Sequence, residues 1–129
     1  MKHSDLTSRI IAICIEVHRE LGPGLLESIY EKAICLELAL AGLSFTRQQG
    51  ISVFYKGTDL DIGFRADVII ENKVLLEIKS IECVNPVHKK ITISYLRHSY
   101  IEIGLVVNFN VIKLTDGITR LVLDRRKLI

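Results

Sequence analysis

The chain has 129 residues, of which 49% are hydrophobic and 25% charged, and its formal net charge at pH 7 is +2. This composition excludes an intrinsically disordered protein, and the length suits a single domain, residues 1–129, built around one hydrophobic core. The small net charge indicates nucleic-acid binding only if the basic residues cluster on the surface. The high apolar fraction is compatible with a protein partner, a homodimer included.

The cysteines and the N-terminal segment indicate in which cellular compartment the protein is expected. Cys14, Cys35 and Cys83 are scattered among apolar residues without a CxxC motif or paired histidines, which argues against zinc and against a disulfide framework. The apolar stretch 10–15 is too short for a signal peptide, and no segment approaches the roughly 20 apolar residues of a membrane span. We therefore expect a cytoplasmic protein without a membrane-spanning segment.

The first third of the sequence predicts two helices. Apolar residues recur at helical spacing over residues 4–21, and Gly22-Pro23-Gly24 ends this helix, because glycine favours the left-handed cap and proline cannot continue a helix. A second helix is expected over residues 26–41, and Gly42 follows it.

Strand-like segments then occupy residues 45–55, 60–70 and 74–80, with Lys56-Gly57-Thr58 as the first turn. Asn85-Pro86 resembles an N-cap followed by proline, and predicts a helix over residues 87–99. An apolar strand is expected over residues 102–109, and residues 111–123 resemble a hairpin that turns at Asp116-Gly117. The order α-α-β-β-β-α-β-β predicts an α/β sandwich with a mixed sheet.

Two carboxylates and a lysine stand out within this apolar, strand-like sequence. Alternate side chains of a strand share a face, so Glu77 and Lys79 point the same way. If residues 71–73 form the turn, Ile70 pairs with Val74 and Asp67 lies opposite Glu77, with Cβ atoms about 4.5–5.5 Å apart. Carboxylates that close repel each other unless a cation joins them, which indicates a divalent metal site with an activated water. The alternative is a solvated charged face, and a two-residue turn would place Asp67 on the other face.

Other residues are weaker candidates. Glu27 lies in the first turn of the second helix, where a favourable interaction with the helix dipole is the simpler explanation. Tyr30 is expected to be a half-buried aromatic with a solvated hydroxyl. Arg65 could contact a phosphate or merely pair with a carboxylate. His88 and Tyr95 share a helix face and are candidate substrate contacts, although a lone histidine there is more often a surface or packing residue than a catalyst.

Several of these residues fall in motifs that together resemble a known family. Gly24-Leu25-Leu26-Glu27-Ser28-Ile29-Tyr30 matches the motif of the GxxExxY proteins, a prokaryotic group in the PD-(D/E)XK nuclease superfamily. The resemblance covers about residues 10–123. It also includes Arg65-Ala66-Asp67, Glu77-Ile78-Lys79, Pro86-Val87-His88, Tyr95-Leu96 and Val107-Asn108-Phe109-Asn110.

This resemblance implies a fold and an activity. The fold would be an α-β-β-β-α-β core with a mixed sheet flanked by helices, here with an additional N-terminal helix. Asp67 and Glu77 would bind Mg²⁺ or Mn²⁺, Lys79 would orient or activate the attacking water, and Glu27 would be a further metal or water ligand. The implied activity is metal-dependent hydrolysis of phosphodiester bonds in nucleic acid, with DNA favoured over RNA.

The sequence departs from the superfamily pattern at two positions. Ala66 replaces the proline that precedes the first carboxylate, at a position where the pattern is loose. Ile91 stands where relatives resembling the RecB-type nucleases carry a glutamine, four residues before Tyr95. The alternative to a nuclease is therefore a catalytically inactive module that uses this fold to bind nucleic acid or a protein partner.

Overall fold

A computed structural model describes residues 2–128, and its elements lie close to those expected from the sequence. All seven expected helices and strands before residue 110 agree with the observed ones to within two residues at each end. The elements are α1 (Ser4–Leu21), α2 (Glu27–Leu40), β1 (Phe45–Tyr55), β2 (Thr58–Ile70), β3 (Val74–Lys79), α3 (Pro86–Ser99), β4 (Ile103–Asn108), the 3₁₀ turn η1 (Leu114–Gly117), β5 (Ile118–Val122) and the 3₁₀ turn η2 (Arg125–Leu128).

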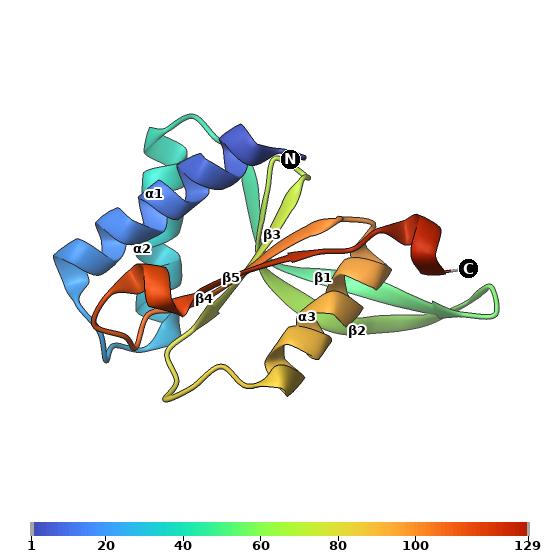
Figure 1. Cartoon of the computed structure of the whole chain (residues 1–129). Coiled ribbons are helices and arrows are strands. Elements are labelled where there is room, and N and C mark those ends of the chain that lie inside the picture. Colours follow the sequence, from blue (N-terminus) through green and yellow to red (C-terminus); the bar gives the residue numbers. More distant parts are fainter. Residues whose placement is uncertain (1, 129) are drawn as a thin grey trace.

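The five strands form one mixed sheet in the order β1-β2-β3-β4-β5. β1, β2 and β3 pair antiparallel, β3 and β4 pair parallel through the α3 crossover, and β5 returns antiparallel to β4. Figure 1 shows α1 and α2 on one side of the sheet and α3 on the other. This arrangement confirms the expected α/β fold class, in which helices cover a mixed sheet.

Side chains that alternate along the central strands separate two apolar layers. In β3, Val74, Leu76 and Ile78 join the larger core under α1 and α2. Leu75 belongs to the smaller cluster that contains Leu96 of α3. Because alternate residues share a face, Glu77 and Lys79 project on the side that α3 covers.

The turn between β2 and β3 sets the register of these strands. Ile70 pairs with Val74, and residues 71–73 form the expected three-residue turn, closed by the Lys73 N–H donating to the Ile70 carbonyl at 3.0 Å. Glu71 has a φ of 54°, a conformation unusual for a residue with a side chain. Its carboxylate accepts hydrogen bonds from the backbone and hydroxyl of Ser44, which hold the turn in place. The expected register is therefore confirmed.

The hairpin expected over residues 111–123 is wrong. Leu114 is 4% exposed and begins η1, and the strand that follows pairs with β4 rather than with residues 111–115. Gly117 is not a turn glycine with positive φ. A Cβ atom there would lie 2.3 Å from the Asn108 carbonyl oxygen, so glycine permits a close approach of two backbones. Asp116-Gly117 therefore ends η1 and does not form a hairpin turn.

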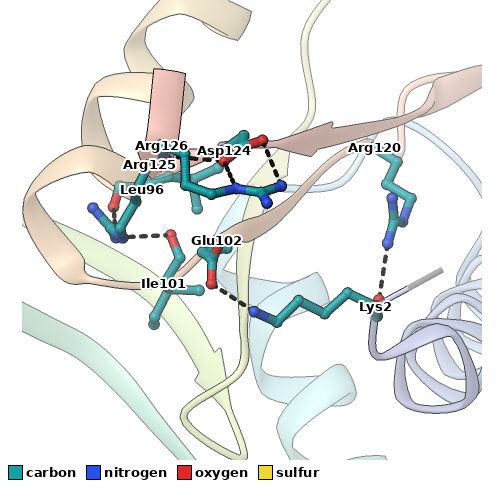
Figure 2. Close-up of polar contacts among 8 residues, drawn as sticks. All are labelled: Lys2, Leu96, Ile101, Glu102, Arg120, Asp124, Arg125 and Arg126. Carbon is teal, nitrogen blue, oxygen red and sulfur yellow. Dashed lines mark hydrogen bonds and ion pairs between the residues drawn. The ribbon is translucent and has the colours of Figure 1, made fainter. Parts of the chain in front are cut away.

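At the edge of the sheet, one set of polar contacts joins Lys2, just before α1, to β5 and to the segment before β4, and another joins the segment after β5 to the end of α3 (Figure 2). Lys2 pairs with Glu102 at 2.6 Å, and Arg120 donates to the Lys2 carbonyl at 3.1 Å. Arg125 donates to the Leu96 carbonyl at 2.8 Å, and so satisfies an acceptor that the end of α3 leaves free. None of the helices described over residues 2–128 combines the length and the apolar character needed to traverse a bilayer.

Candidate active site

Asp67 and Glu77 lie where β2 and β3 separate. The last paired residues are Val68 and Leu76, and continuing this register places Asp67 opposite Glu77. Beyond Leu76, the Ile78 N–H of β3 donates to Asp67 Oδ2 at 2.8 Å. This side-chain bond links β2 and β3 where their backbone pairing has ended. The expectation that the two carboxylates face each other thus follows from the observed register.

Glu77 is a buried carboxylate with an unusual electrostatic environment. It is 4% exposed, and its Oε1 is the one buried side-chain oxygen or nitrogen without a hydrogen-bond partner among the residues described. Burial, followed by the nearby charge of Asp67, raises the pKa of Glu77 to about 9. The Lys79 ammonium acts in the opposite direction. A buried acceptor without a partner needs a proton or a cation to compensate it.

Lys79 ends β3 and is held by the neighbouring strand. It stands opposite Asn108 of β4, and its carbonyl accepts the Phe109 N–H at 2.8 Å. The side chain of the buried Asn108 holds the segment after Lys79 through two hydrogen bonds. Its Oδ1 accepts the Ile81 N–H at 3.1 Å, and its Nδ2 donates to the Ile81 carbonyl at 2.9 Å. The lysine therefore emerges from a fixed backbone on the face that carries Glu77.

Glu27 approaches the same end of β3 from α2. Its Oε2 accepts the Ser80 N–H at 3.0 Å, directly after Lys79, and the Ser80 hydroxyl donates to the Leu25 carbonyl at 2.6 Å. An open pocket of about 560 Å³ adjoins this contact. Its lining comprises Gly24, Leu25, Leu26, Glu27, Ser28, Ser80 and Asn110.

A glutamine from β1 also reaches the site. The Gln48 side-chain amide donates to Asp67 Oδ1 at 3.2 Å and to Glu31 Oε1 at 2.7 Å. Glu31 is buried on α2, and its Oε2 is bound by both Arg47 Nη2 at 2.9 Å and Arg47 Nε at 3.1 Å. A polar chain thus runs from Arg47 through Glu31 and Gln48 to Asp67.

The expected substrate residues lie in different surroundings. Tyr95 of α3 stacks on Phe64 with ring centroids 4.0 Å apart, and its pKa is raised by burial and then by the charges of Glu77 and Asp67. The His88 ring accepts the Asn85 N–H at 3.1 Å, closing a capping box at the start of α3. Arg65 is exposed and donates to the Gln48 carbonyl at 3.5 Å.

Tyr30 has a structural role beside this site. It is fully buried rather than half-buried, and its hydroxyl donates to the Gly22 carbonyl at 2.6 Å and accepts the Leu25 N–H at 3.1 Å. The expectation of a solvated hydroxyl is wrong, because the loop before α2 supplies both of its hydrogen-bond partners. Tyr30 thereby fixes the segment that leads into Glu27.

Comparison with known proteins agrees with this geometry. A family model described as the PD-(D/E)XK nuclease superfamily matches residues 4–121, nearly the whole chain. The chain belongs to the PD-(D/E)XK nuclease superfamily. No curated protein and no solved structure gives a significant match to it.

Nucleases of the PD-(D/E)XK superfamily generally use Mg²⁺ or Mn²⁺. The site fits such an ion in part, because two carboxylates converge and Glu77 Oε1 lacks any other partner. Over residues 2–128, however, no three Asp, Glu, His or Cys side chains gather closely enough to share one metal ion. The expectation that Glu27 is a third ligand therefore stays a prediction.

The superfamily pattern is incomplete on α3. Ile91, at the position of the glutamine found in relatives, is 43% exposed. Ala66, at the position of the proline, is fully buried. The α3 side of the site therefore offers the Tyr95 side chain but no amide at position 91.

Sequence reasoning missed Gln48, Glu31 and Asn108. The pairing of β1 with β2 brings Gln48 to Asp67, and the packing of α2 brings Glu31 to Gln48. Asn108 offered two signals, its place in the Val107-Asn108-Phe109-Asn110 motif and its polar side chain at the end of an otherwise apolar strand. The carboxyl end of a parallel strand is a frequent position for site residues.

Proposed function

We propose that the protein is a metal-dependent nuclease of the GxxExxY group, with its active site at Asp67, Glu77, Lys79 and Glu27. The observation that carries this proposal is the partnerless buried oxygen of Glu77 beside the second carboxylate, Asp67. An isolated buried carboxylate is costly, and a functional site is where such a cost is retained.

The residues of the site divide the chemistry among them. Asp67 and Glu77 would hold Mg²⁺ or Mn²⁺ through their carboxylate oxygens. When bound, the ion polarises the scissile phosphate and lowers the pKa of a water. Lys79, on the same strand face as Glu77, stabilises the negative charge that develops on the phosphate or orients the nucleophile. Glu77 must release its proton to bind the ion, and Lys79 favours that release.

The substrate is nucleic acid, with DNA favoured over RNA. Lys89, Lys90 and Arg97 give the exposed side of α3 three positive charges, and none of them forms an ion pair with the residues described. Unpaired cations on one helix suit a polyanion and attract it at low ionic strength. Tyr95 and Arg65 remain proposed substrate contacts.

The test is cleavage of end-labelled single- and double-stranded DNA and RNA with Mg²⁺ or Mn²⁺, beside purified Glu77→Gln. Glutamine matches the shape of glutamate but cannot supply the charge. Cleavage by the wild type alone supports the proposal and identifies the substrate. Equal cleavage by both proteins indicates a contaminating nuclease.

If the protein cleaves none of the substrates but binds DNA or RNA, the proposed nuclease function is wrong. The inactive nucleic-acid-binding module is then the supported function. A specific observation keeps this second function in view, namely the exposed Ile91 in place of a polar residue on α3.

A further inference from the structure

We propose that Gln48 is a positioning residue for Asp67, which orients this carboxylate for metal binding; the role rests on the function proposed above. The Gln48 amide nitrogen lies 3.2 Å from Asp67 Oδ1 and 2.7 Å from Glu31 Oε1. An ionised carboxylate only accepts hydrogen bonds, so the NH₂ end, with two hydrogens, is the end that satisfies both neighbours. Gln48 therefore links Asp67 on the sheet to α2.

Glu31 anchors the far end of this link. It is 7% exposed, and the Arg47 guanidinium binds its Oε2 through two nitrogens, at 2.9 and 3.1 Å. The pairing compensates the buried charge and fixes the carboxylate, which leaves Oε1 for Gln48. The amide of the exposed Gln48 side chain is therefore anchored to the buried Glu31 carboxylate while it contacts Asp67.

The backbone of Gln48 adopts an unusual conformation. Its φ is 49°, in the left-handed region that disfavours residues with a side chain. Such conformations persist where the surroundings impose them, and they cluster at functional sites. Glycine would fit this backbone better, so Gln48→Gly removes the side chain without adding backbone strain.

The role of the Gln48 amide follows from the second hydrogen bond that Asp67 accepts. Its Oδ2 accepts the Ile78 N–H at 2.8 Å, so β3 holds one carboxylate oxygen and Gln48 of β1 holds the other. Each oxygen keeps a further lone pair for a metal ion. Hydrogen bonds that orient a ligating carboxylate typically contribute about 10- to 100-fold to metal affinity or activity.

The test measures the Mn²⁺ dissociation constant by isothermal titration calorimetry for the wild type, Gln48→Gly, Gln48→Met and Gln49→Ala. Glycine removes the amide and relieves the backbone, but it also leaves the buried Glu31 Oε1 without this donor, so circular dichroism must first show that each variant folds. Methionine keeps the length and the backbone strain but has no N–H donor. Both variants should bind Mn²⁺ about tenfold more weakly than the wild type, at the lower end of the usual range for such contacts.

Gln49→Ala is the matched control. Gln49 is the adjacent glutamine, but its side chain accepts the Thr46 hydroxyl at 2.6 Å and is not hydrogen-bonded to Asp67. Its Mn²⁺ affinity should equal that of the wild type. Wild-type affinity in both Gln48 variants would overturn the inference and leave the nuclease proposal standing. Weaker binding in Gln48→Gly but not Gln48→Met would assign the effect to the backbone and also overturn it. A wild type that binds no Mn²⁺ would overturn both.

Discussion

Asp67 Oδ2 lies 2.8 Å from the backbone nitrogen of Ile78 and accepts its hydrogen bond. This bond ties the carboxylate on β2 to the strand that carries Glu77, at the point where the two strands stop pairing. The separation of the proposed metal ligands is therefore set by the backbone of the sheet. The site is preorganised to that extent before any ion binds.

Asp67→Ala and Lys79→Ala should each lower the rate of cleavage about 10²–10³-fold, the usual loss when one preorganised group is removed. The first variant lacks a metal ligand, and the second lacks the charge that assists the nucleophile or the phosphate. Initial rates on labelled DNA in saturating Mg²⁺ measure both, after circular dichroism has shown that the variants fold. Lys73→Ala is the control. Like Lys79, Lys73 ends a Glu-x-Lys triplet, here Glu71-Asn72-Lys73, but it lies in the exposed turn after β2. Wild-type turnover in Lys79→Ala would remove Lys79 from the mechanism.

Glu77 should make the metal-free protein less stable as the pH rises. Its pKa is raised from 4.5 to about 9, so the folded state holds this proton more tightly than the unfolded state does. The resulting stabilisation is complete below about pH 4.5 and is lost as the pH rises through 9. One pKa unit corresponds to about 1.4 kcal/mol, so the change is on the order of a few kcal/mol.

Glu77→Gln isolates this effect, because glutamine does not ionise while the other groups titrate as before. Urea unfolding of both metal-free proteins at pH 5, 7 and 9 gives the two stability profiles. The variant should become more stable than the wild type toward pH 9. Parallel profiles would show that Glu77 titrates normally, and would remove the electrostatic basis of the proposed site.

The register around Asp67 illustrates what the sequence could predict. Residues 71–73 are too polar for the core and separate two apolar runs, so counting outward from Ile70 and Val74 was enough to place Asp67 opposite Glu77. This prediction needs only the polar turn residues and the alternation of side chains between the two faces of a strand. The helix boundaries followed likewise from glycine, proline and the Asn85 cap.

Gln48 shows why the rest of the site could not be predicted. Counting back from the paired residues Tyr55 and Thr58 in a regular hairpin would place Arg65 opposite Gln48. Two irregularities in the β1–β2 pairing, on either side of Ser52, shift the register so that Arg47 pairs with Val68 instead. No sequence pattern signals these irregularities. Nor does any pattern show that α2 brings Glu31 to the same place.

Glu27→Gln tests whether the α2 carboxylate contributes charge to the site. Glutamine keeps an oxygen that can accept the Ser80 N–H, so the backbone contact at 3.0 Å and the thermal stability should survive. If Glu27 binds the ion or its water, Mn²⁺ affinity should fall about tenfold, as for a residue that supports a metal site. Glu37→Gln, farther along α2, is the control. Unchanged affinity in Glu27→Gln would limit Glu27 to holding Ser80.

Tyr30→Phe should destabilise the protein by about 1–3 kcal/mol, the usual cost of leaving buried polar groups without partners. The ring would still stack on Phe109, whose centroid lies 4.4 Å away. The Gly22 carbonyl and the Leu25 N–H, however, would both lose the hydroxyl that they share. Urea unfolding measures the loss.

Tyr100→Phe supplies the comparison, because Tyr100 is 81% exposed and surface substitutions usually change stability by less than about 0.5 kcal/mol. The loop that Tyr30 holds leads directly into Glu27, so Tyr30→Phe should also loosen the start of α2. Hydrogen exchange of the amides from Gly24 to Ile29 should therefore accelerate in Tyr30→Phe and not in Tyr100→Phe. Equal stability of the two variants would mean that the hydroxyl is dispensable, and that ring packing alone accounts for a tyrosine at this position.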